Sequence, residues 1–216
     1  MSLLERAVSG AVASLAQLAS GATARWTGEG PTMEQRIYFA NHSSHLDFVV
    51  LWSCLPREVR ERTRPVAAAD YWSSGLRRRL ACNVFRAVLV ERATRAAAIE
   101  ARRNREQGRT KMIDPLLEVL DSGESLILFP EGTRGNGYEV AQFKNGLYSL
   151  CAARPGVKLV PVYLENLNRV LPKGEMLVIP MICKVTFGSA MELRAGERPE
   201  EFLTRTRAAL CGLRDE

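Results

Sequence analysis

Residues 36–47 read RIYFANHSSHLD. The run Ile37–Ala40 is short and apolar, as expected of a strand, and residues Leu46–Cys54 follow the apolar spacing of a helix. The polar residues between them include the only two histidines of the chain, His42 and His45. A strand that passes directly into a helix is the first half of a βαβ unit, so this stretch predicts a parallel sheet.

The rest of the chain repeats this alternation of short apolar runs and helical patterns. The predicted strands are Arg36–Ala40, Pro65–Ala69, Ala87–Glu91, Ser125–Phe129, Lys158–Leu164, Met176–Ile182 and Lys184–Phe187. The predicted helices are Leu46–Cys54, Ser73–Cys82, Thr94–Glu106, Met112–Asp121, Phe143–Ala153 and Pro199–Leu213. We therefore expect an α/β fold with a largely parallel central sheet flanked by helices. The last two predicted strands are close enough to form a hairpin, which would make the sheet mixed.

The length and composition fit one globular domain with a short N-terminal extension. The chain has 216 residues, of which 46% are hydrophobic and 25% charged. We expect residues 1–25 to form an N-terminal amphipathic helix and residues 26–216 to form a single domain. The five cysteines are isolated and never spaced as Cys-x-x-Cys, which is typical of a reducing compartment.

The N-terminal helix carries an apolar stripe but is short for a membrane span. The stripe consists of Leu4, Val8, Ala11, Val12, Leu15 and Leu18. The segment Leu3–Ala19 falls below the ~20 apolar residues that a span requires, and it contains Glu5 and Arg6. Two interpretations stay open: the stripe packs on the domain, or it lies on a bilayer surface.

The charge of the chain favours anionic partners. The formal net charge is +6 and the sequence pI is about 9.3. Phosphorylated small molecules, acidic carrier proteins, anionic lipid surfaces and nucleic acid all fit this charge. Only 7% of the residues are aromatic, and basic and aromatic residues nowhere interleave as on a single-strand binding surface. We therefore expect no nucleic-acid partner.

His42 and Asp47 are candidates for a base and the carboxylate that orients it. Five residues along a continuous helix correspond to about 500° of rotation, which would separate the two side chains. They can meet if His42 lies in the turn before the helix and Asp47 lies in its first turn. Ser43 or Ser44 then suits the N-cap, and Ser44-x-x-Asp47 matches a capping box. Asp47 would hold Nδ1–H of His42 and leave Nε2 as a base, or would only cap the helix.

Two other interpretations of this segment, a metal site and a serine nucleophile, have less support from the sequence. His42 and His45 form a His-x-x-His pair, but the chain has no third histidine. A zinc site would therefore need Asp47 and a remote carboxylate such as Glu131. A serine nucleophile here would lack the Gly-x-Ser-x-Gly turn that exposes such a residue. We expect no metal site.

The second informative stretch is FPEGTRG, residues 129–135, at the end of a predicted strand. Its proline cannot donate a ladder hydrogen bond, and its two glycines let the backbone bend and expose N–H groups. Thr133 and Arg134 add a hydroxyl and a forked cation. This combination suits a phosphate, whereas a plain turn would explain only the glycines.

The expected topology brings these segments together. In a parallel sheet with right-handed crossovers, the carboxyl ends of the strands lie along one edge, where ligands bind. His42 and Asp47 follow one predicted strand. Glu131 and Arg134 follow another, and Arg92 ends a third. We expect these side chains to converge, although some lie about ninety residues apart in the sequence.

Taken together, the two segments resemble the PlsC-type glycerophospholipid acyltransferases, the lysophosphatidic acid acyltransferase family. The resemblance rests on His-x4-Asp from His42 to Asp47, followed by Phe-Pro-Glu-Gly-Thr-Arg at residues 129–134. Weaker matches are VLVER at 88–92, FKNG at 143–146 and LVPV at 159–162. The resemblance runs from about Arg36 to Glu165, which is most of the chain.

The resemblance implies transfer of a fatty acyl group from acyl-CoA or acyl carrier protein to the free hydroxyl of a lysophospholipid, 1-acyl-glycerol-3-phosphate. The acyl donor is a co-substrate, and no further cofactor is implied. His42 would remove the proton from the acceptor hydroxyl, and Asp47 would orient His42. No covalent enzyme intermediate is needed.

The resemblance also implies a set of substrate-binding residues. They are Arg92, Glu131, Gly132, Thr133, Arg134 and Lys144. The basic residues and Thr133 would hold the acceptor's phosphate. Glu131 would shape the site or bind an acceptor hydroxyl, and backbone N–H groups near Gly132 would stabilise the developing oxyanion.

The chain departs from the family pattern in two places. Where the family has a lysine near the start of its second block, residues 67–72 read AAADYW, which leaves the acceptor open. Many members also have longer hydrophobic N-terminal segments, so we expect peripheral attachment at the cytoplasmic face of a membrane. The alternatives are the same transfer to another lysolipid, such as an amino-acid-containing one, a metal hydrolase, and a lipid- or carrier-binding protein without catalysis.

Overall fold

The computed structural model describes residues 3–44, 46–69, 72, 75–90, 107–167 and 182–215. Its helices are α1 (Leu3–Ser20), α2 (Asp47–Cys54), α3 (Arg57–Glu61), α4 (Gly75–Arg79), α6 (Gln107–Asp121), α7 (Gly146–Ala153) and α9 (Pro199–Gly212), with a π-helical turn η1 (Leu80–Val84) and a 3-10 turn η2 (Leu213–Asp215). Its strands are β1 (Thr23–Trp26), β2 (Arg36–Ala40), β3 (Thr63–Ala68), β4 (Val88–Val90), β5 (Ser125–Leu128), β6 (Lys158–Glu165) and β7 (Lys184–Phe187).

These strands form one seven-stranded sheet in the order β1-β7-β6-β2-β5-β3-β4. All neighbours run parallel except β6 and β7, which are antiparallel. The predicted α/β fold with a largely parallel sheet is confirmed. The sheet is mixed because β7 runs against β6. The sequence predicted a different source of mixing, a hairpin between strands at 176–182 and 184–187. Residues 176–181 lie outside the described residues, so this hairpin stays a prediction.

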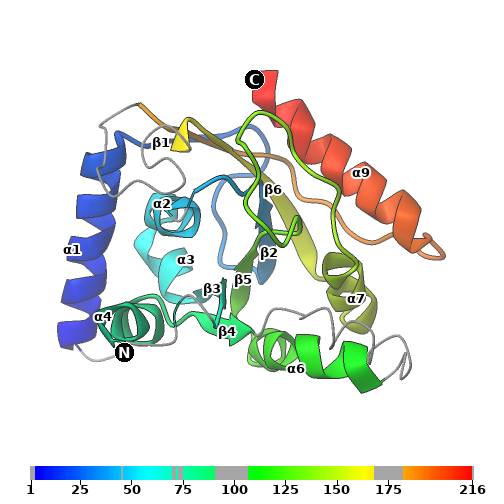
Figure 1. Ribbon diagram of the computed structural model, residues 1–216, viewed down its shortest axis with the longest axis horizontal. Helices are drawn as coiled ribbons and strands as arrows, with labels where there is room; N and C mark the ends of the chain where they lie inside the picture. Colours follow the sequence, from blue (N-terminus) through cyan, green and yellow to red (C-terminus); the bar gives the residue numbers. More distant parts are fainter. Residues whose placement is uncertain are drawn as a thin grey trace.

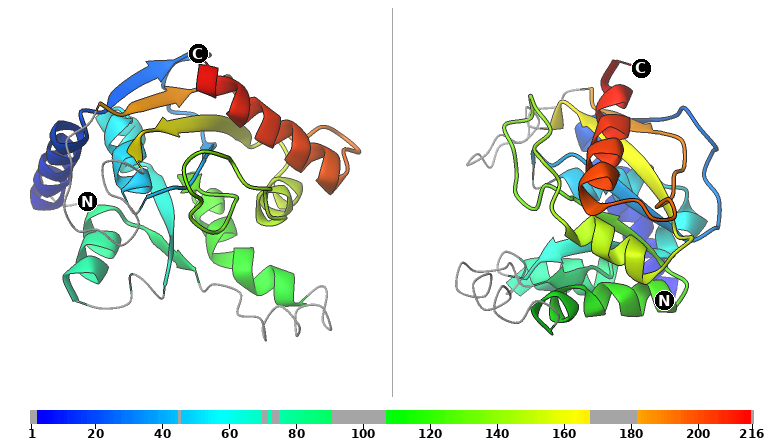
Figure 2. Two further views of the ribbon diagram at one scale, coloured as in Figure 1. Left: turned by 45° about the horizontal axis from the view of Figure 1, so that its top comes forward. Right: turned by 90° about the vertical axis from the view of Figure 1, so that its right-hand side faces the viewer.

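Helices cover both faces of the sheet (Figure 1 and Figure 2). α1, α2 and η1 pack on one face, while α6, α7 and α9 pack on the other. Successive β2 residues alternate between the two cores: Tyr38 and Ala40 join the first, Ile37 and Phe39 the second. Because β2 is buried on both faces, its backbone is a rigid support for the residues that follow it.

Most predicted elements are present, with shifts at their ends. α6 begins at Gln107, five residues before the predicted Met112. α7 begins at Gly146 and not at Phe143, because the Lys144 N–H donates to the carbonyl of Pro130 and belongs to the preceding loop. The predicted helix at 73–82 is divided between α4 and η1. The predicted helix at 94–106 lies outside the described residues.

Two short elements, β1 and α3, were not predicted from the sequence. β1 reads TARW and is mostly exposed, so it lacks the apolar run that marks the buried strands. α3 is a five-residue helix whose one buried residue is Val59. Neither short element has more than one buried side chain, so neither produces an apolar periodicity that a search for periodic patterns could detect.

Candidate active site

His42 and Asp47 form a hydrogen-bonded pair at the carboxyl edge of the sheet. Nδ1 of His42 lies 2.8 Å from Oδ2 of Asp47. The Asp47 side chain is fully buried, whereas 21% of the His42 side chain is exposed. His42 lies in the turn after β2 and Asp47 is the first residue of α2. The carboxylate accepts the hydrogen bond, so Nδ1 carries the proton and Nε2 is left as the basic nitrogen.

The same carboxylate oxygen organises the turn. Oδ2 of Asp47 also accepts the backbone N–H groups of Ser43 at 2.6 Å and Ser44 at 2.8 Å. The prediction that Ser43 or Ser44 caps α2 is wrong, because the N-cap residue is Leu46 and no side chain caps it. The Ser44 hydroxyl instead accepts the Leu46 N–H at 3.3 Å. Asp47 therefore reaches back over the turn and orients the imidazole with the same atom.

The backbone of His42 is held on both sides by the loop that follows β5. Its N–H donates to Oε1 of Glu131 at 2.7 Å, and its carbonyl accepts the Gly135 N–H at 2.8 Å. The sheet register explains this pairing: Phe39 lies opposite Leu128, and three residues further on His42 meets Glu131. The His42 ring also stacks on Phe129, with centroids 4.4 Å apart.

Glu131 is engaged by backbone groups through both carboxylate oxygens. Oε2 accepts the Ala141 N–H at 2.8 Å, while Oε1 holds His42. The side chain is only 3% exposed. Burial raises the pKa of the Glu131 carboxyl group, and the hydrogen bonds from Ala141 and His42 partly offset this rise. This geometry favours the site-shaping role over direct contact with an acceptor hydroxyl.

Three polar or cationic side chains of the same loop region have no partner in the part of the chain that the structure describes. Thr133 and Lys144 are exposed and Arg134 is half-buried. Lys144 lies against Gly132, since a Cβ atom added there would be 2.8 Å from Nζ of Lys144. Unpaired donors on one short loop are suited to an anionic group.

Of the backbone N–H groups near Gly132 that were expected to stabilise an oxyanion, the N–H of Gly132 itself already has a partner. The Gly132 N–H donates to the carbonyl of Phe129 at 3.0 Å and closes a tight turn, with φ of 69° at the glycine. Two other predicted residues, His45 and Arg92, lie outside the described residues, and their roles stay predictions. Among the described residues, no group of three or more His, Cys, Asp and Glu is placed to hold a metal ion.

Asn41 supports the site and was not predicted from the sequence. Its side-chain amide donates to the Leu164 carbonyl at 3.0 Å and accepts the Leu164 N–H at 2.8 Å. This pair extends the contact between β2 and β6 by one residue beyond the strand end. An asparagine directly after a buried strand was the available signal, because its side chain can imitate a backbone partner.

The fold is a three-layer α/β sheet with a histidine–carboxylate pair at the carboxyl ends of its strands, an arrangement that suits general-base chemistry. The chain belongs to the acyltransferase family, whose model matches residues 27–165. The family resemblance predicted from the sequence is confirmed.

Individual relatives agree with this assignment. The chain is 28% identical over 141 residues to a 1-acyl-sn-glycerol-3-phosphate acyltransferase of Chlamydomonas reinhardtii, covering 64% of this chain and 36% of that protein. It is 28% identical over 166 residues to the taffazin of Dictyostelium discoideum, covering 74% and 53%. The chain thus spans about a third to a half of the length of these relatives.

A solved structure has the same fold. The crystal structure of the 1-acyl-sn-glycerophosphate acyltransferase PlsC from Thermotoga maritima matches with a TM-score of 0.68 and 20% sequence identity. The match covers 98% of this chain and 80% of that chain. At this level of identity the comparison shows the fold.

Proposed function

We propose that this protein transfers a fatty acyl group from acyl-CoA or acyl carrier protein to the free hydroxyl of 1-acyl-glycerol-3-phosphate. The observation that carries the proposal is the 2.8 Å contact between His42 and Asp47, at the ligand-binding edge of a sheet in a chain of the acyltransferase family. The name of the Chlamydomonas reinhardtii relative supports this acceptor.

The mechanism is direct transfer with His42 as general base. Nε2 removes the proton from the acceptor hydroxyl as its oxygen attacks the thioester carbonyl. The tetrahedral intermediate then collapses, the carbon–sulfur bond breaks, and the imidazolium returns the proton to the departing thiolate. The buried Asp47 carboxylate stabilises the imidazolium and keeps the ring oriented throughout.

The acceptor's phosphate is assigned to the free donors beside the base. Thr133, Arg134 and Lys144 supply a hydroxyl, a guanidinium and an ammonium, and Arg92 joins them in the proposal from the family pattern. A guanidinium fork suits two phosphate oxygens, and the ammonium adds a mobile point charge. Glu131 takes part by holding the His42 backbone and not by touching the acceptor.

The first test measures thiol release from acyl-CoA and from acyl carrier protein, with lysophosphatidate as acceptor. Wild type is compared with His42→Ala and Asp47→Asn, with and without a chelator. We expect acceptor-dependent release that survives the chelator and falls by about 10²-fold or more in His42→Ala, because a positioned base contributes that much. Release that His42→Ala leaves intact would refute the mechanism.

The remaining alternatives separate in the same assay. Loss of release on chelation, together with loss in His45→Gln, would point to the metal hydrolase. If thiol is released with an amino-acid-containing lysolipid but not with lysophosphatidate, the acyl-transfer mechanism is supported and the acceptor is a different lysolipid. Binding of lysophosphatidate without any thiol release would support a non-catalytic lipid-binding protein.

We also infer that α1 attaches the protein to a membrane surface. No helix in the described ranges is both long and apolar enough to span a bilayer. The residues of α1 that are fully buried are small or polar, namely Ser9, Ala13 and Ser20, and Val12 is partly buried against the core. Two large apolar residues of its second half point outward: Leu15 is 65% exposed and Leu18 is 81% exposed. An ordinary surface helix has the opposite orientation.

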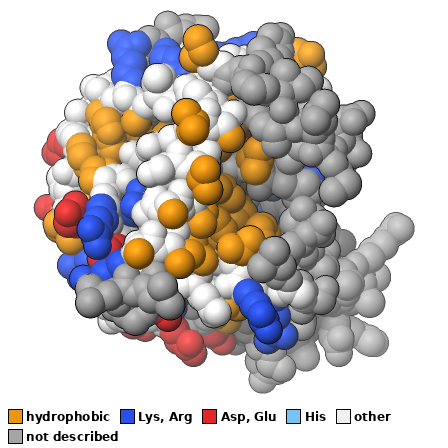
Figure 3. Space-filling view, turned by 90° about the vertical axis from the view of Figure 1, so that its left-hand side faces the viewer, with side chains coloured by type: hydrophobic (Ala, Val, Ile, Leu, Met, Phe, Trp, Pro, Cys, Tyr) orange, Lys and Arg blue, Asp and Glu red, His pale blue; other side chains and the backbone are white. Residues whose placement is uncertain are grey.

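The exposed apolar face extends beyond the helix. Ile182, 76% exposed, adjoins the end of α1, because the Cys183 N–H donates to the Ser20 carbonyl. Figure 3 faces this side of the molecule and shows hydrophobic side chains gathered on it, with lysine and arginine side chains nearby. Apolar side chains beside basic ones suit an anionic bilayer surface.

Flotation with anionic phospholipid vesicles tests this attachment. We expect the double variant Leu15→Ser, Leu18→Ser to float less than wild type, because both side chains would enter the bilayer interface. Met33→Ser is the matched control, since Met33 is an apolar residue outside α1 and is 51% exposed. Equal flotation of the double variant and the control would contradict the proposal.

A further inference from the structure

The C-terminal helix α9 lies outside the family match at residues 27–165, yet it binds the loop that supports the active site. Nε of Arg207 donates to the carbonyls of Val140 at 3.0 Å and Ala141 at 3.1 Å, and its Nη2 also donates to Val140. Arg214 in η2 donates to the Tyr138 carbonyl at 3.1 Å. Figure 1 shows this loop, between β5 and α7, running beside α9.

Glu131 binds the same loop segment from the other side. The Ala141 N–H donates to Oε2 of Glu131 at 2.8 Å, while the Ala141 carbonyl accepts from Arg207. Oε1 of Glu131 accepts the His42 N–H at 2.7 Å. A continuous series of hydrogen bonds therefore runs from the Arg207 guanidinium, through residues 140–141 and Glu131, to the backbone of His42.

The path of this loop is set by tertiary contacts and not by regular secondary structure. Residues 129–145 contain no helix or strand, and two glycines, Gly132 and Gly137, have positive φ angles of 69° and 82°. Glycines of this kind leave the backbone many conformations. A guanidinium is always charged and holds several donors in one plane, so it can fix two successive carbonyls at once.

We propose that Arg207 is a positioning residue of the acyl-transfer site. It fixes residues 140–141, which fix the Glu131 carboxylate, which in turn sets the position of the His42 backbone. The hydrogen bonds of the Arg207 side chain go to Val140 and Ala141, so Arg207 acts on His42 through this series. The inference rests on the proposed role of His42 as the base.

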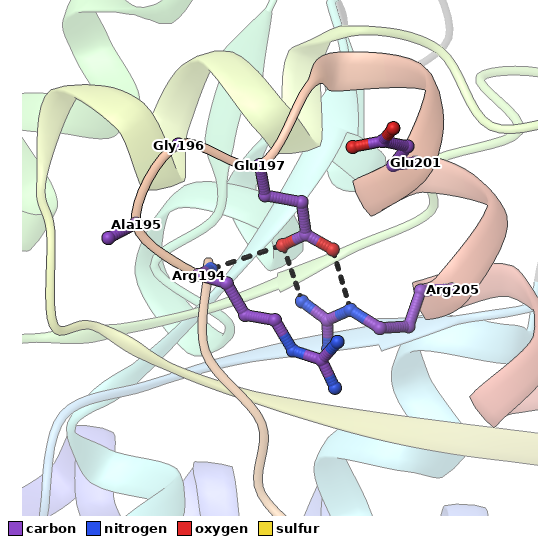
Figure 4. Close-up of a pocket in the computed structure, with 6 residues that line it drawn as sticks. All are labelled: Arg194, Ala195, Gly196, Glu197, Glu201 and Arg205. Atoms are coloured by element: carbon purple, nitrogen blue, oxygen red, sulfur yellow. Dashed lines mark hydrogen bonds and ion pairs between the residues drawn. The ribbon is translucent and has the colours of Figure 1, made fainter.

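Arg205 offers a matched control on the same helix. Its Nε and Nη2 each lie 2.7 Å from a carboxylate oxygen of Glu197, and Nη2 also donates to the Glu192 carbonyl at 2.8 Å. Figure 4 shows this ion pair lining a surface pocket with Arg194 and Glu201. Arg205→Ala thus also removes an arginine that ties α9 to a loop, but one outside the series that leads to His42.

The experiment measures kcat and KM for the acceptor in Arg207→Ala, Arg205→Ala, Glu131→Gln and the two double variants with Glu131→Gln. Each is assayed well below its own melting temperature. We expect Arg207→Ala to lower kcat by on the order of 10-fold to 10²-fold, with a smaller change in KM, because displacement of a base chiefly affects the transition state. Arg205→Ala keeps kcat near the wild-type value.

The double variants measure whether the kcat losses of Arg207→Ala and Glu131→Gln are coupled, which a purely structural role of Arg207 would not produce. The glutamine side chain of Glu131→Gln has a single acceptor oxygen, so it can keep only one of the hydrogen bonds from the Ala141 and His42 N–H groups, and the series from Arg207 to His42 is broken at one of these two bonds. We therefore expect Arg207→Ala to add little loss of kcat in the Glu131→Gln background. Should Arg207→Ala fail to fold, the same coupling is measured with Arg207→Lys, which keeps the charge but not the fork.

Two outcomes overturn the inference. One is a kcat for Arg207→Ala no lower than that of Arg205→Ala. The other is full additivity of the Arg207 and Glu131 losses. If either outcome is found and His42→Ala is inactive, only the positioning role of Arg207 is rejected. An active His42→Ala rejects the proposed base, and the inference with it.

Discussion

A single carboxylate oxygen of Asp47 serves two purposes. Oδ2 accepts Nδ1–H of His42 and the backbone N–H groups of Ser43 and Ser44. The sequence left base orientation and helix capping as competing roles for this residue. The structure combines them, because the carboxylate that folds the turn is the one that orients the imidazole. We therefore expect any substitution of Asp47 to change both the local backbone and the proposed base, His42.

Gly132 permits a test of Lys144. Gly132→Ala places a methyl group where the end of the Lys144 side chain lies, 2.8 Å from Nζ, and forces alanine into a positive φ of 69°. Because Lys144 is proposed to hold the acceptor's phosphate, we expect KM for lysophosphatidate to rise several-fold while kcat changes less. Steady-state kinetics measure this.

Gly123→Ala is the control for the backbone cost of that substitution. Gly123 has a φ of 76°, and a Cβ atom there would meet nothing closer than 3.9 Å. Both variants should lose ~1–2 kcal/mol of unfolding free energy from the left-handed conformation. A matching rise of KM in Gly123→Ala would remove Lys144 from the explanation.

Tyr38 carries a buried hydroxyl whose oxygen has no hydrogen-bond partner among the described residues. Tyr38→Phe removes this unpaired group, so we expect the unfolding free energy near neutral pH to stay equal or rise by ~1 kcal/mol. Denaturant unfolding monitored by circular dichroism measures the change. A loss of more than ~1 kcal/mol would mean that the hydroxyl is paired in solution.

The same tyrosine predicts a pH dependence. Burial raises the pKa of Tyr38 to about 12, and the Arg36 charge partly offsets this rise. The unfolded tyrosine ionises near pH ~10, so the wild type loses ~2–3 kcal/mol as the pH rises from about 10 to about 12. Tyr38→Phe should lack this loss, whereas Tyr138→Phe, at a tyrosine 60% exposed, should retain it.

At the scale of elements, the residues by which α1 packs on the domain are not its largest apolar residues. The sequence left open whether the apolar stripe of α1 packs on the domain or lies on a bilayer. In the structure the fully buried residues are Ser9, Ala13 and Ser20, Val12 is partly buried, and the Gln17 side chain donates to the Ser53 carbonyl at 2.7 Å. Small residues let the helix approach its neighbours closely, while Leu15 and Leu18 remain on the outside. The direction of the stripe was a matter of packing that periodicity alone does not decide.

This orientation gives a stability prediction for α1. Ala13→Leu inserts a large side chain where Ala13 is 3% exposed, so we expect a loss of ~1–3 kcal/mol of unfolding free energy. Leu18→Ser, at a residue 81% exposed, should change it by less than ~0.5 kcal/mol. Chemical denaturation in the absence of lipid compares the two, and the reverse ranking would show that α1 packs by its apolar stripe.

At the scale of the whole molecule, the net charge of +6 predicts salt-sensitive attachment. Basic groups near an anionic surface each contribute up to ~1 kcal/mol, and this contribution is screened within about 10 Å at 0.1 M salt. We expect flotation with anionic vesicles to fall as sodium chloride rises, and flotation with neutral vesicles to change little. Equal salt dependence on both vesicles would exclude an electrostatic contribution.

The sequence by itself determined the α/β class, the parallel centre of the sheet and the pair of segments that form the site. Buried strands and their helices are encoded locally, as apolar runs and periodic patterns. The convergence of His42 with Glu131 also followed, because parallel topology sends both segments to one edge. These features depend on local patterns and on topological rules that hold across many proteins.

Only the tertiary structure decided how the groups are shared within the site. It gave Oδ2 of Asp47 three donors, turned the Gly132 N–H into a turn contact and assigned both oxygens of Glu131 to backbone groups. It also joined Arg207 to the active-site loop, 66 residues away in sequence from Ala141. Such partners follow from distances of about 3 Å between segments remote in the chain, and a one-dimensional pattern does not contain those distances.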